Sequence, residues 1–247
     1  MMTNMDELSK YAQMHKMTIP NGDGGSSSGG SAPVNPWAGK KWFAYGTSLT
    51  AGQSGTHVSY APILAQKLGV TLTNKGKGGS GITASASDQT NMTRMTDLTD
   101  GKLTADLITI EVGANDGTAN VGDIDDDDDT TFCGALNVIL ETLVKSKYTG
   151  RLCVIPSTPG RYATSSVDHE PYDPIASTFY TKYLDRLEKG RQICSKWHVP
   201  YLNANDINGI SPYHDMYYVD NIHLTQAGAS RQADALYSLI KNISPIE

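Results

Sequence analysis

Residues 105–112 read ADLITIEV, and this stretch decides the fold class of the chain. It is rich in β-branched residues and contains neither glycine nor proline, so it is the strongest strand prediction in the sequence. The sequence GAND at 113–116 follows at once and predicts a turn beyond the end of the strand.

Shorter apolar runs alternate with helical patterns on both sides of this strand. Further strands are predicted at 41–45, 70–74, 151–156 and 199–203, and helices at 60–68, 131–147, 173–196 and 225–242. Strand–helix alternation implies parallel strands joined by right-handed crossovers. We therefore expect an α/β fold, a three-layer α/β/α sandwich with a flavodoxin-like parallel sheet of about five strands. In such sheets ligands bind beyond the carboxyl ends of the strands.

The two longest predicted helices also predict buried side chains. On the 173–196 helix the apolar side carries Tyr180, Tyr183, Leu184, Leu187 and Ile193. On the 225–242 helix the inward positions are Ala229, Ala233, Leu236 and Ile240. Both patterns follow the 3.6-residue period of a helix that packs on a sheet.

The first 36 residues differ from the rest of the chain in composition. Residues 1–20 predict a short helix with an a/d-like spacing, either a frayed tail or a peptide that oligomerises or attaches to a larger assembly. Residues 21–36 read NGDGGSSSGGSAPVNP, a Gly/Ser-rich flexible linker. One α/β domain is therefore expected over residues 37–247.

Composition narrows the class of protein. The chain has 247 residues, of which 38% are hydrophobic, and a net charge of −6. An acidic chain without a Lys/Arg-rich stripe argues against a nucleic-acid partner. No apolar run is long enough for a membrane span, and residues 1–10 lack the pattern of a signal peptide. We expect a cytoplasmic protein, or one exported otherwise, such as a component of a phage virion.

The sequence contains two sets of possible metal ligands. Cys133, Cys153 and Cys194 lie far apart and have no C-x-x-C spacing, so we expect small buried side chains and no disulfide framework or zinc site. The acidic run Asp123–Asp129 lacks the glycine and distal glutamate of an EF-hand, and a solvated loop is favoured over a calcium site. No metal or other cofactor is expected.

Two loops carry the parts of a nucleophile and its base. Ser48, in the sequence GTS at 46–48, comes just past the end of the first predicted strand. In DNIHLT at 220–225, Asp220 and His223 precede the last helix at a spacing that lets the carboxylate reach Nδ1 of the imidazole. Nε2 then faces a nucleophile. The serine motif alone is a weak signal, and the Asp–His pair, although a better one, is also compatible with an ordinary loop.

Two further loops carry hydrogen-bond donors. The glycine-rich stretch NKGKGGSG at 74–81 follows the second predicted strand and can expose backbone N–H groups, although it also suits a flexible turn. Its spacing fits neither a P-loop nor a dinucleotide fingerprint. Asn115 offers a neutral side-chain donor at the same edge of the sheet, or an ordinary Asx turn.

Together these four segments resemble blocks I, II, III and V of the SGNH (GDSL-type) hydrolases, in the right order, over residues 37 to about 243. The resemblance implies Ser48 as nucleophile, His223 as general base and Asp220 as its orienting partner. It also implies an oxyanion hole made by the N–H groups of Ser48 and Gly79 and by the Asn115 amide. The family's fold is the same α/β/α sandwich.

The sequence departs from the family pattern at two positions. Block I usually reads Gly-Asp-Ser, and Thr47 stands in place of that aspartate. An acidic residue often follows the block II glycine, and Ser80 stands there instead. The first departure bears on the rigidity of the nucleophile loop rather than on the triad.

The resemblance implies a serine esterase, and other features indicate the substrate. There is no long apolar lid, and the flanking loops are rich in tyrosine, which favours a short acyl group on a polar alcohol, such as an O-acetylated carbohydrate. Thr47, Arg161, Tyr162 and Tyr218 are candidates to line the substrate site. The cluster Tyr213, His214, Tyr217 and Tyr218 suits either stacking on sugar rings or packing under a long loop.

Two alternatives stay open. One is a lipase, thioesterase or lysophospholipase of the same family, which would prefer long acyl chains. The other is a non-catalytic glycan-binding module or phage structural module on the same scaffold, against which the four intact motifs argue. The leading hypothesis for its setting is a phage tail or baseplate enzyme that deacetylates host surface glycans.

Overall fold

The computed structural model describes residues 35–86, 104–117, 119–146, 148–160 and 178–246, and the side chains of 178–180 are left undescribed. The predicted segment 1–20 and all but the last two residues of the predicted linker lie outside these ranges. Asn35 begins the described part, and its side-chain amide donates to the carbonyl of Leu68 at 2.8 Å.

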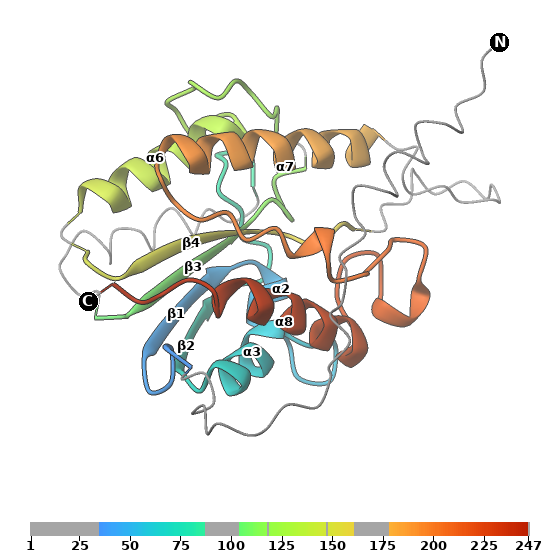
Figure 1. Ribbon diagram of the computed structural model, residues 1–247. Helices are drawn as coiled ribbons and strands as arrows, with labels where there is room; N and C mark the ends of the chain where they lie inside the picture. The colour runs from blue at the N-terminus through green and yellow to red at the C-terminus, as the bar shows by residue number, and fades with distance from the viewer. Residues whose placement is uncertain (1–34, 87–103, 118, 147, 161–177, 247) are drawn as a thin grey trace, which may run out of the picture. The chain divides into compact units, whose positions relative to one another are not determined.

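A parallel sheet of four strands forms the centre of the described chain (Figure 1). Its strands are β1 (Lys41–Gly46), β2 (Thr71–Gly76), β3 (Leu107–Val112) and β4 (Arg151–Pro156). Their order is β2-β1-β3-β4, with Trp42 beside Leu107 and Leu107 beside Arg151. The order is that of a flavodoxin-like sheet, as predicted.

Helices cover both faces of the sheet and make three layers (Figure 1). The helices α3 (Tyr60–Leu68) and α8 (Gln226–Ile240) pack on one face, and α6 (Phe132–Lys145) and α7 (Thr178–Lys196) pack on the other. A short helix, α2 (Ser48–Ala51), follows β1 directly. The 3₁₀ turns η2 (Ala204–Asp206) and η3 (Asp215–Tyr217) lie between α7 and α8. The expected α/β/α sandwich is confirmed.

The helices begin and end where the sequence places local hydrogen-bond partners. Ser59, Thr131 and Thr225 precede α3, α6 and α8, and each accepts a hydrogen bond from a backbone N–H of the first turn. Gly69 ends α3 with a φ of 65°, the left-handed conformation that suits glycine.

The predicted fifth strand is wrong as an element. Only Tyr201 bridges to Val154, through backbone hydrogen bonds from Val154 to Pro200 and from Leu202 to Val154. Pro200 has no N–H to extend the pairing, and Asn203 already caps the turn η2. The segment therefore pairs with β4 through a single bridge, and the sheet of the described residues has four strands.

Burial follows the helix patterns with one exception. Ala229, Ala233, Leu236 and Ile240 are fully buried, and so is Ile193. Leu184, predicted to face inward, is 49% exposed, and Arg186 is buried on that helix instead. The side chain of Tyr180 lies outside the described part of the chain.

The three cysteines are buried and unbridged, as expected. Burial raises the pKa of Cys133 and of Cys153 to about 12, so both thiols stay protonated near neutral pH. None of the helices that the structure describes is long and apolar enough to cross a bilayer.

Candidate active site

Ser48, His223 and Asp220 form a continuous hydrogen-bonded row. Nε2 of His223 lies 2.8 Å from Oγ of Ser48, and Nδ1 of His223 lies 2.7 Å from Oδ2 of Asp220. Because a carboxylate only accepts, Nδ1 carries the hydrogen of the neutral ring and Nε2 is left to accept from the serine hydroxyl. The row has the connectivity of an acyl-transfer triad.

Local turns hold both ends of this row. Ser48 is the first residue of α2, immediately beyond β1, and Thr47 caps that helix. Asp220 uses its other oxygen, Oδ1, to accept from the backbone N–H groups of Ile222 and His223, each at 2.7 Å. The carboxylate is therefore fixed in an Asx turn that aims Oδ2 at the imidazole.

The charge of Asp220 follows from these contacts. Burial acts to raise its pKa, but hydrogen bonds from the His223 ring and from the His223 and Ile222 N–H groups outweigh burial. The net effect is a pKa below the ordinary value for aspartate, so Asp220 is an anion at neutral pH.

A second histidine, which the sequence did not predict, lies against the first. The ring of His57 stacks on His223, with centroids 4.0 Å apart and planes inclined by 23°. Its Nε2 lies 3.1 Å from the backbone oxygen of Ser48, so the ring is also tied to the nucleophile loop. Burial, followed by the proximity of His223, lowers the pKa of His57 and favours the neutral ring. A lone histidine in a loop gives no signal of this role in the sequence.

The residues expected to bind an oxyanion gather beside Ser48. Gly79 has a φ of 74° and lines the same groove as Ser48, Asn115 and His223. The Asn115 amide donates to the carbonyl of Ser80 at 2.9 Å, which ties the third block to the glycine loop. Asp116 strengthens this tie, because its Oδ1 accepts from the N–H groups of Ile82 and Thr83.

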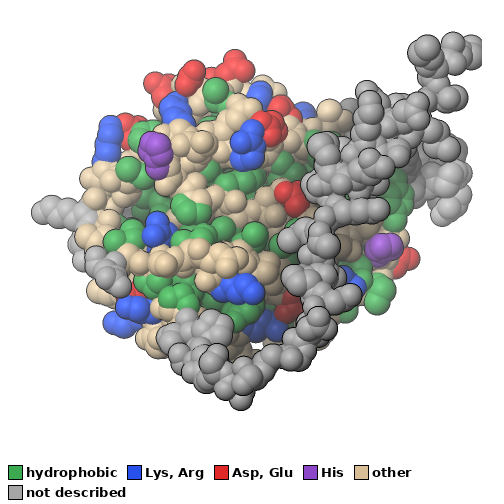
Figure 2. Space-filling model, viewed as in Figure 1, with side chains coloured by type: hydrophobic (Ala, Val, Ile, Leu, Met, Phe, Trp, Pro, Cys, Tyr) green, Lys and Arg blue, Asp and Glu red, His purple; other side chains and the backbone are tan. Residues whose placement is uncertain are grey.

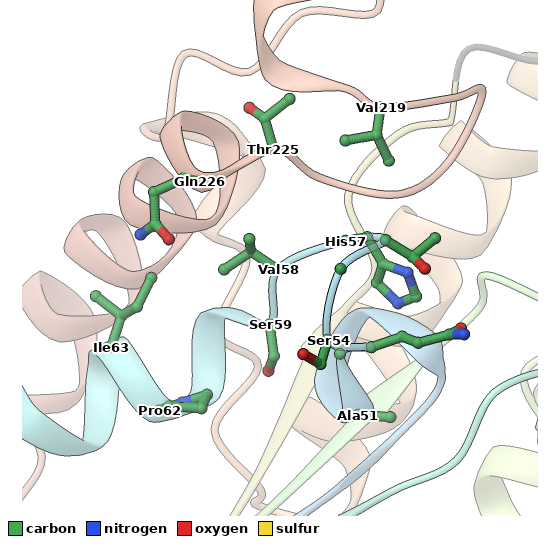
Figure 3. A pocket seen from close by; sticks show the side chains of 14 residues that line it. Ala51, Ser54, His57, Val58, Ser59, Pro62, Ile63, Val219, Thr225 and Gln226 are labelled. Atoms are coloured by element: carbon green, nitrogen blue, oxygen red, sulfur yellow. The ribbon is translucent and has the colours of Figure 1, made fainter.

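Two adjoining grooves lie at the candidate site, and the first contains the triad residues. One, of about 620 Å³, surrounds Ser48 and is lined by Gly78, Gly79, Asn115, Ile222 and His223 among others. The second, of about 630 Å³, shares with it the wall made by Ala51, Gly52, Gln53, Thr56 and His57. Figure 3 shows Pro62 and Ile63 on one side of this second groove and Thr225 and Gln226 on the other.

Comparison with known proteins shows the family of the chain. A model of the GDSL-like Lipase/Acylhydrolase family matches residues 44–231, which is more than half of the chain. The chain belongs to this family. No curated protein matches the sequence.

Solved structures of low sequence identity share the fold. A protein from Lactobacillus plantarum is 24% identical, with a TM-score of 0.67 over 83% of this chain and 98% of that one. An aryl esterase of M. smegmatis is 19% identical, with a TM-score of 0.59 over 83% and 99%. A carbohydrate acetylesterase family member from Sinorhizobium meliloti is 16% identical, with a TM-score of 0.54 over 82% and 98%.

In this GDSL-family chain the side chain of Thr47 does not line the groove around Ser48. Thr47 is fully buried, and both its N–H and its hydroxyl donate to Oε2 of Glu111 at 2.7 Å. The expectation that Thr47 lines the substrate site is therefore wrong. The Thr47 hydroxyl is directed toward β3, because β3 is the neighbour of β1 and Glu111 is its next-to-last residue.

The other expected lining residues are only partly described. Tyr218 is buried, and its hydroxyl donates to the carbonyl of Pro159 at 2.6 Å, so it packs under the loop and does not line the groove. Tyr217 is also buried, below the guanidinium of Arg231, whereas Tyr213 is 50% exposed. Packing thus accounts for two of the three tyrosines in this cluster. Arg161 and Tyr162 lie outside the described residues.

The acidic run precedes α6, which packs on the face of the sheet opposite to α3 and α8. Asp126 accepts from the backbone of Asp123 and from the hydroxyl of Thr131, and Asp125 pairs with Lys196 at 3.0 Å. Figure 2 shows acidic side chains gathered with basic ones at the top of the viewed face. Within the part of the chain that the structure describes, no three His, Cys, Asp or Glu side chains are grouped to hold a metal ion.

Proposed function

We propose that the chain is a serine esterase in which Ser48 is the nucleophile, His223 the general base and Asp220 its orienting partner. The observation that carries the proposal is the pair of contacts of His223, 2.8 Å to the Ser48 hydroxyl and 2.7 Å to the Asp220 carboxylate. Membership of the GDSL-like lipase/acylhydrolase family supports an ester as the substrate class.

The proposed mechanism follows from these positions. As Oγ of Ser48 attacks the ester carbonyl, its proton passes to Nε2 of His223, and Asp220 stabilises the imidazolium. The oxyanion is held by the N–H groups of Ser48 and Gly79 and by the Asn115 amide. The alcohol leaves with the proton from Nε2. Water then attacks the acyl-enzyme with the same base and releases the carboxylic acid and free Ser48.

For the substrate, we propose a short acyl group, O-acetyl above all, on a neutral alcohol such as a carbohydrate. Ala51, Gly52, Gly78 and Gly79 make the wall around Ser48 from small residues, which suits a small acyl group. Of the described residues that line the second groove, none is Lys, Arg, Asp or Glu, and Gln53, Ser54, Thr56 and Gln226 offer neutral hydrogen-bonding groups. The acetylesterase from Sinorhizobium meliloti is alike in fold only, so the substrate proposal rests on the grooves.

Hydrolysis of p-nitrophenyl esters from acetate to decanoate, by wild type and Ser48→Ala, tests the proposal. Acetate turnover that disappears in Ser48→Ala supports the serine esterase and the short acyl group. A maximum at long chains instead supports the lipase or thioesterase alternative, for which the aliphatic residues Val58, Pro62, Ile63 and Val219 of the second groove would provide contacts. If no ester is turned over, acetate release from acetylated polysaccharides decides between strict glycan specificity and a binding module.

A further inference from the structure

A carboxyl group that the proposed mechanism does not use lies directly below the nucleophile loop. Glu111 is 1% exposed and is the next-to-last residue of β3, whose other residues are apolar except for Thr109. Its Oε2 accepts from the backbone N–H and the hydroxyl of Thr47, and from the hydroxyl of Thr50 at 3.3 Å. Among the described residues no Lys or Arg forms an ion pair with Glu111.

The other oxygen of this carboxyl reaches the end of β4. Oε1 of Glu111 forms a short hydrogen bond with the hydroxyl of Ser157, and that hydroxyl also lies 2.8 Å from the carbonyl oxygen of Val112. Two oxygen atoms at these distances need a hydrogen between them. The serine hydroxyl has one hydrogen for two contacts, and a carbonyl oxygen has none to give. Each of the two contacts has a hydrogen of its own when Glu111 is protonated and supplies the second one.

We propose that Glu111 is a positioning residue that is held as a neutral carboxylic acid and joins the Ser48 loop to the ends of β3 and β4. In this arrangement Ser157 donates to Val112, Oε1–H of Glu111 donates to Ser157, and Oε2 accepts from Thr47 and Thr50. The inference rests on the proposed role of Ser48 as nucleophile, because the loop held in place is the one that carries Ser48.

The surroundings of Glu111 agree with a neutral acid. Burial raises its pKa, against the smaller opposing effect of its hydrogen bonds. The titratable side chain that faces it from α3 is Tyr60, whose hydroxyl lies 3.0 Å from that of Thr50. Burial, followed by the proximity of Glu111, raises the pKa of Tyr60 as well, so its side chain stays a neutral phenol. From α7 the buried guanidinium of Arg186 lines a small cavity with Val112 and Ser157, and it forms no ion pair with Glu111.

The same contact accounts for the departure at position 47. An aspartate there would direct a second carboxylate toward Glu111, whereas the threonine hydroxyl donates a hydrogen bond to it. Gly46 leaves room for the arrangement, because a Cβ at that position would lie 2.8 Å from Oε2 of Glu111 and 2.1 Å from Oγ1 of Thr50. Thr47 and Glu111 are therefore a complementary pair within this chain.

Two substitutions in the full chain separate a neutral acid from a carboxylate. Glu111→Gln has the shape of the protonated acid: its oxygen accepts from Thr47 and Thr50, and its NH₂ donates to Ser157. Glu111→Leu has similar size and neither function. We expect Glu111→Gln to keep kcat near wild type, and Glu111→Leu to lower kcat about 10²-fold with little change in KM, as for a misplaced catalytic group. An equal loss in both variants, or no loss in a folded Glu111→Leu protein, overturns the proposal.

A readout independent of catalysis keeps the test decisive if wild type hydrolyses no available ester. An acid whose pKa is raised on folding stays protonated in the native state while the unfolded chain ionises above about pH 4.5, the ordinary value. The unfolding free energy of wild type should therefore fall relative to Glu111→Gln as pH rises from 4.5 toward 8. Urea unfolding measures it, and parallel curves for the two proteins would show an ionised Glu111 and refute the neutral acid.

Discussion

The imidazoles of His57 and His223 are stacked 4.0 Å apart, while each ring also contacts Ser48, one at its backbone oxygen and the other at its hydroxyl. The nucleophile loop is thus held by one histidine and, in the proposed mechanism, deprotonated by the other. A neutral His57 presents its ring face to the positive charge that develops on His223, which is a favourable arrangement.

The stack leads to a prediction for the rate. His57→Phe keeps a flat ring against His223 and loses only the contact with the Ser48 backbone, whereas His57→Ala removes both. We expect kcat/KM to fall in the order wild type, His57→Phe, His57→Ala, with about a tenfold loss in the alanine variant, corresponding to roughly 1.4 kcal/mol. Steady-state kinetics on p-nitrophenyl acetate measures the order. Equal rates for phenylalanine and alanine would remove any role for the stack.

His57 also predicts how stability depends on pH. Because its pKa is lowered in the folded state, the unfolded chain takes up a proton near pH 6.5 while the native chain does not. Wild type should therefore lose unfolding free energy as pH falls below 6.5, until the native ring is protonated as well. His57→Phe should lose less over the same range. Urea unfolding at several pH values between 8 and 5 makes the comparison, and identical pH dependence would contradict the prediction.

Asp220→Asn should impair catalysis by changing the histidine tautomer. Its oxygen can still accept from the Ile222 and His223 N–H groups, which leaves the NH₂ facing Nδ1. Nδ1 must then accept, Nε2 carries the hydrogen, and the ring can no longer take the proton of Ser48. We expect kcat to fall about 10⁴-fold with the fold intact.

Asp234→Asn is the matched control for that substitution. Asp234 pairs with Lys67 on the surface, with its side chain 62% exposed, and such pairs contribute little to stability. Kinetics and circular dichroism should show the large loss of kcat in Asp220→Asn alone. A comparable loss in Asp234→Asn would mean that removal of any acidic side chain disturbs the enzyme.

Close packing of α2 on β2 gives a prediction for stability. A Cβ at Gly76 would lie 2.3 Å from the backbone nitrogen of Ala51, whereas one at Gly78 meets nothing within 4 Å. We expect Gly76→Ala to lower the unfolding free energy by about 1–3 kcal/mol, as overpacking does, and Gly78→Ala to leave it nearly unchanged. Urea unfolding of the two variants decides the matter, and similar stabilities would show that α2 shifts freely.

Much of the fold was predictable because it depends on local patterns. Apolar runs and turn residues mark β1 to β4, and parallel strands bring their carboxyl ends to one edge whatever the loops contain. That rule places Ser48, Asn115 and the glycine loop together. The prediction of a fifth strand was wrong because Pro200 and Asn203 limit the pairing with β4 to one bridge. Pro200 has no N–H to donate, and Asn203 caps the turn that follows.

The remaining parts of the site depend on tertiary contacts. His57 reaches His223 through the fold of a short loop, and no spacing in the sequence links the two residues. Glu111 did leave a signal, since it is the one charged residue between Leu107 and Val112. Its hydrogen-bond partners Thr47 and Ser157, however, lie just beyond the ends of two other strands, β1 and β4. Thr47 and Tyr218 point into the protein because each forms a hydrogen bond with a residue far away in the sequence, Glu111 and Pro159 respectively.

Ser48 and His223, which lie 2.8 Å apart in space, are separated by 175 positions in the chain. During synthesis, β1 and the Ser48 that follows it are therefore made long before His223. Every strand of the sheet that the structure describes is complete while the base is still unsynthesised. In the proposed mechanism a chain still being synthesised would therefore carry Ser48 without its base, and activity would arise only after residue 223 has been made and has folded against the sheet.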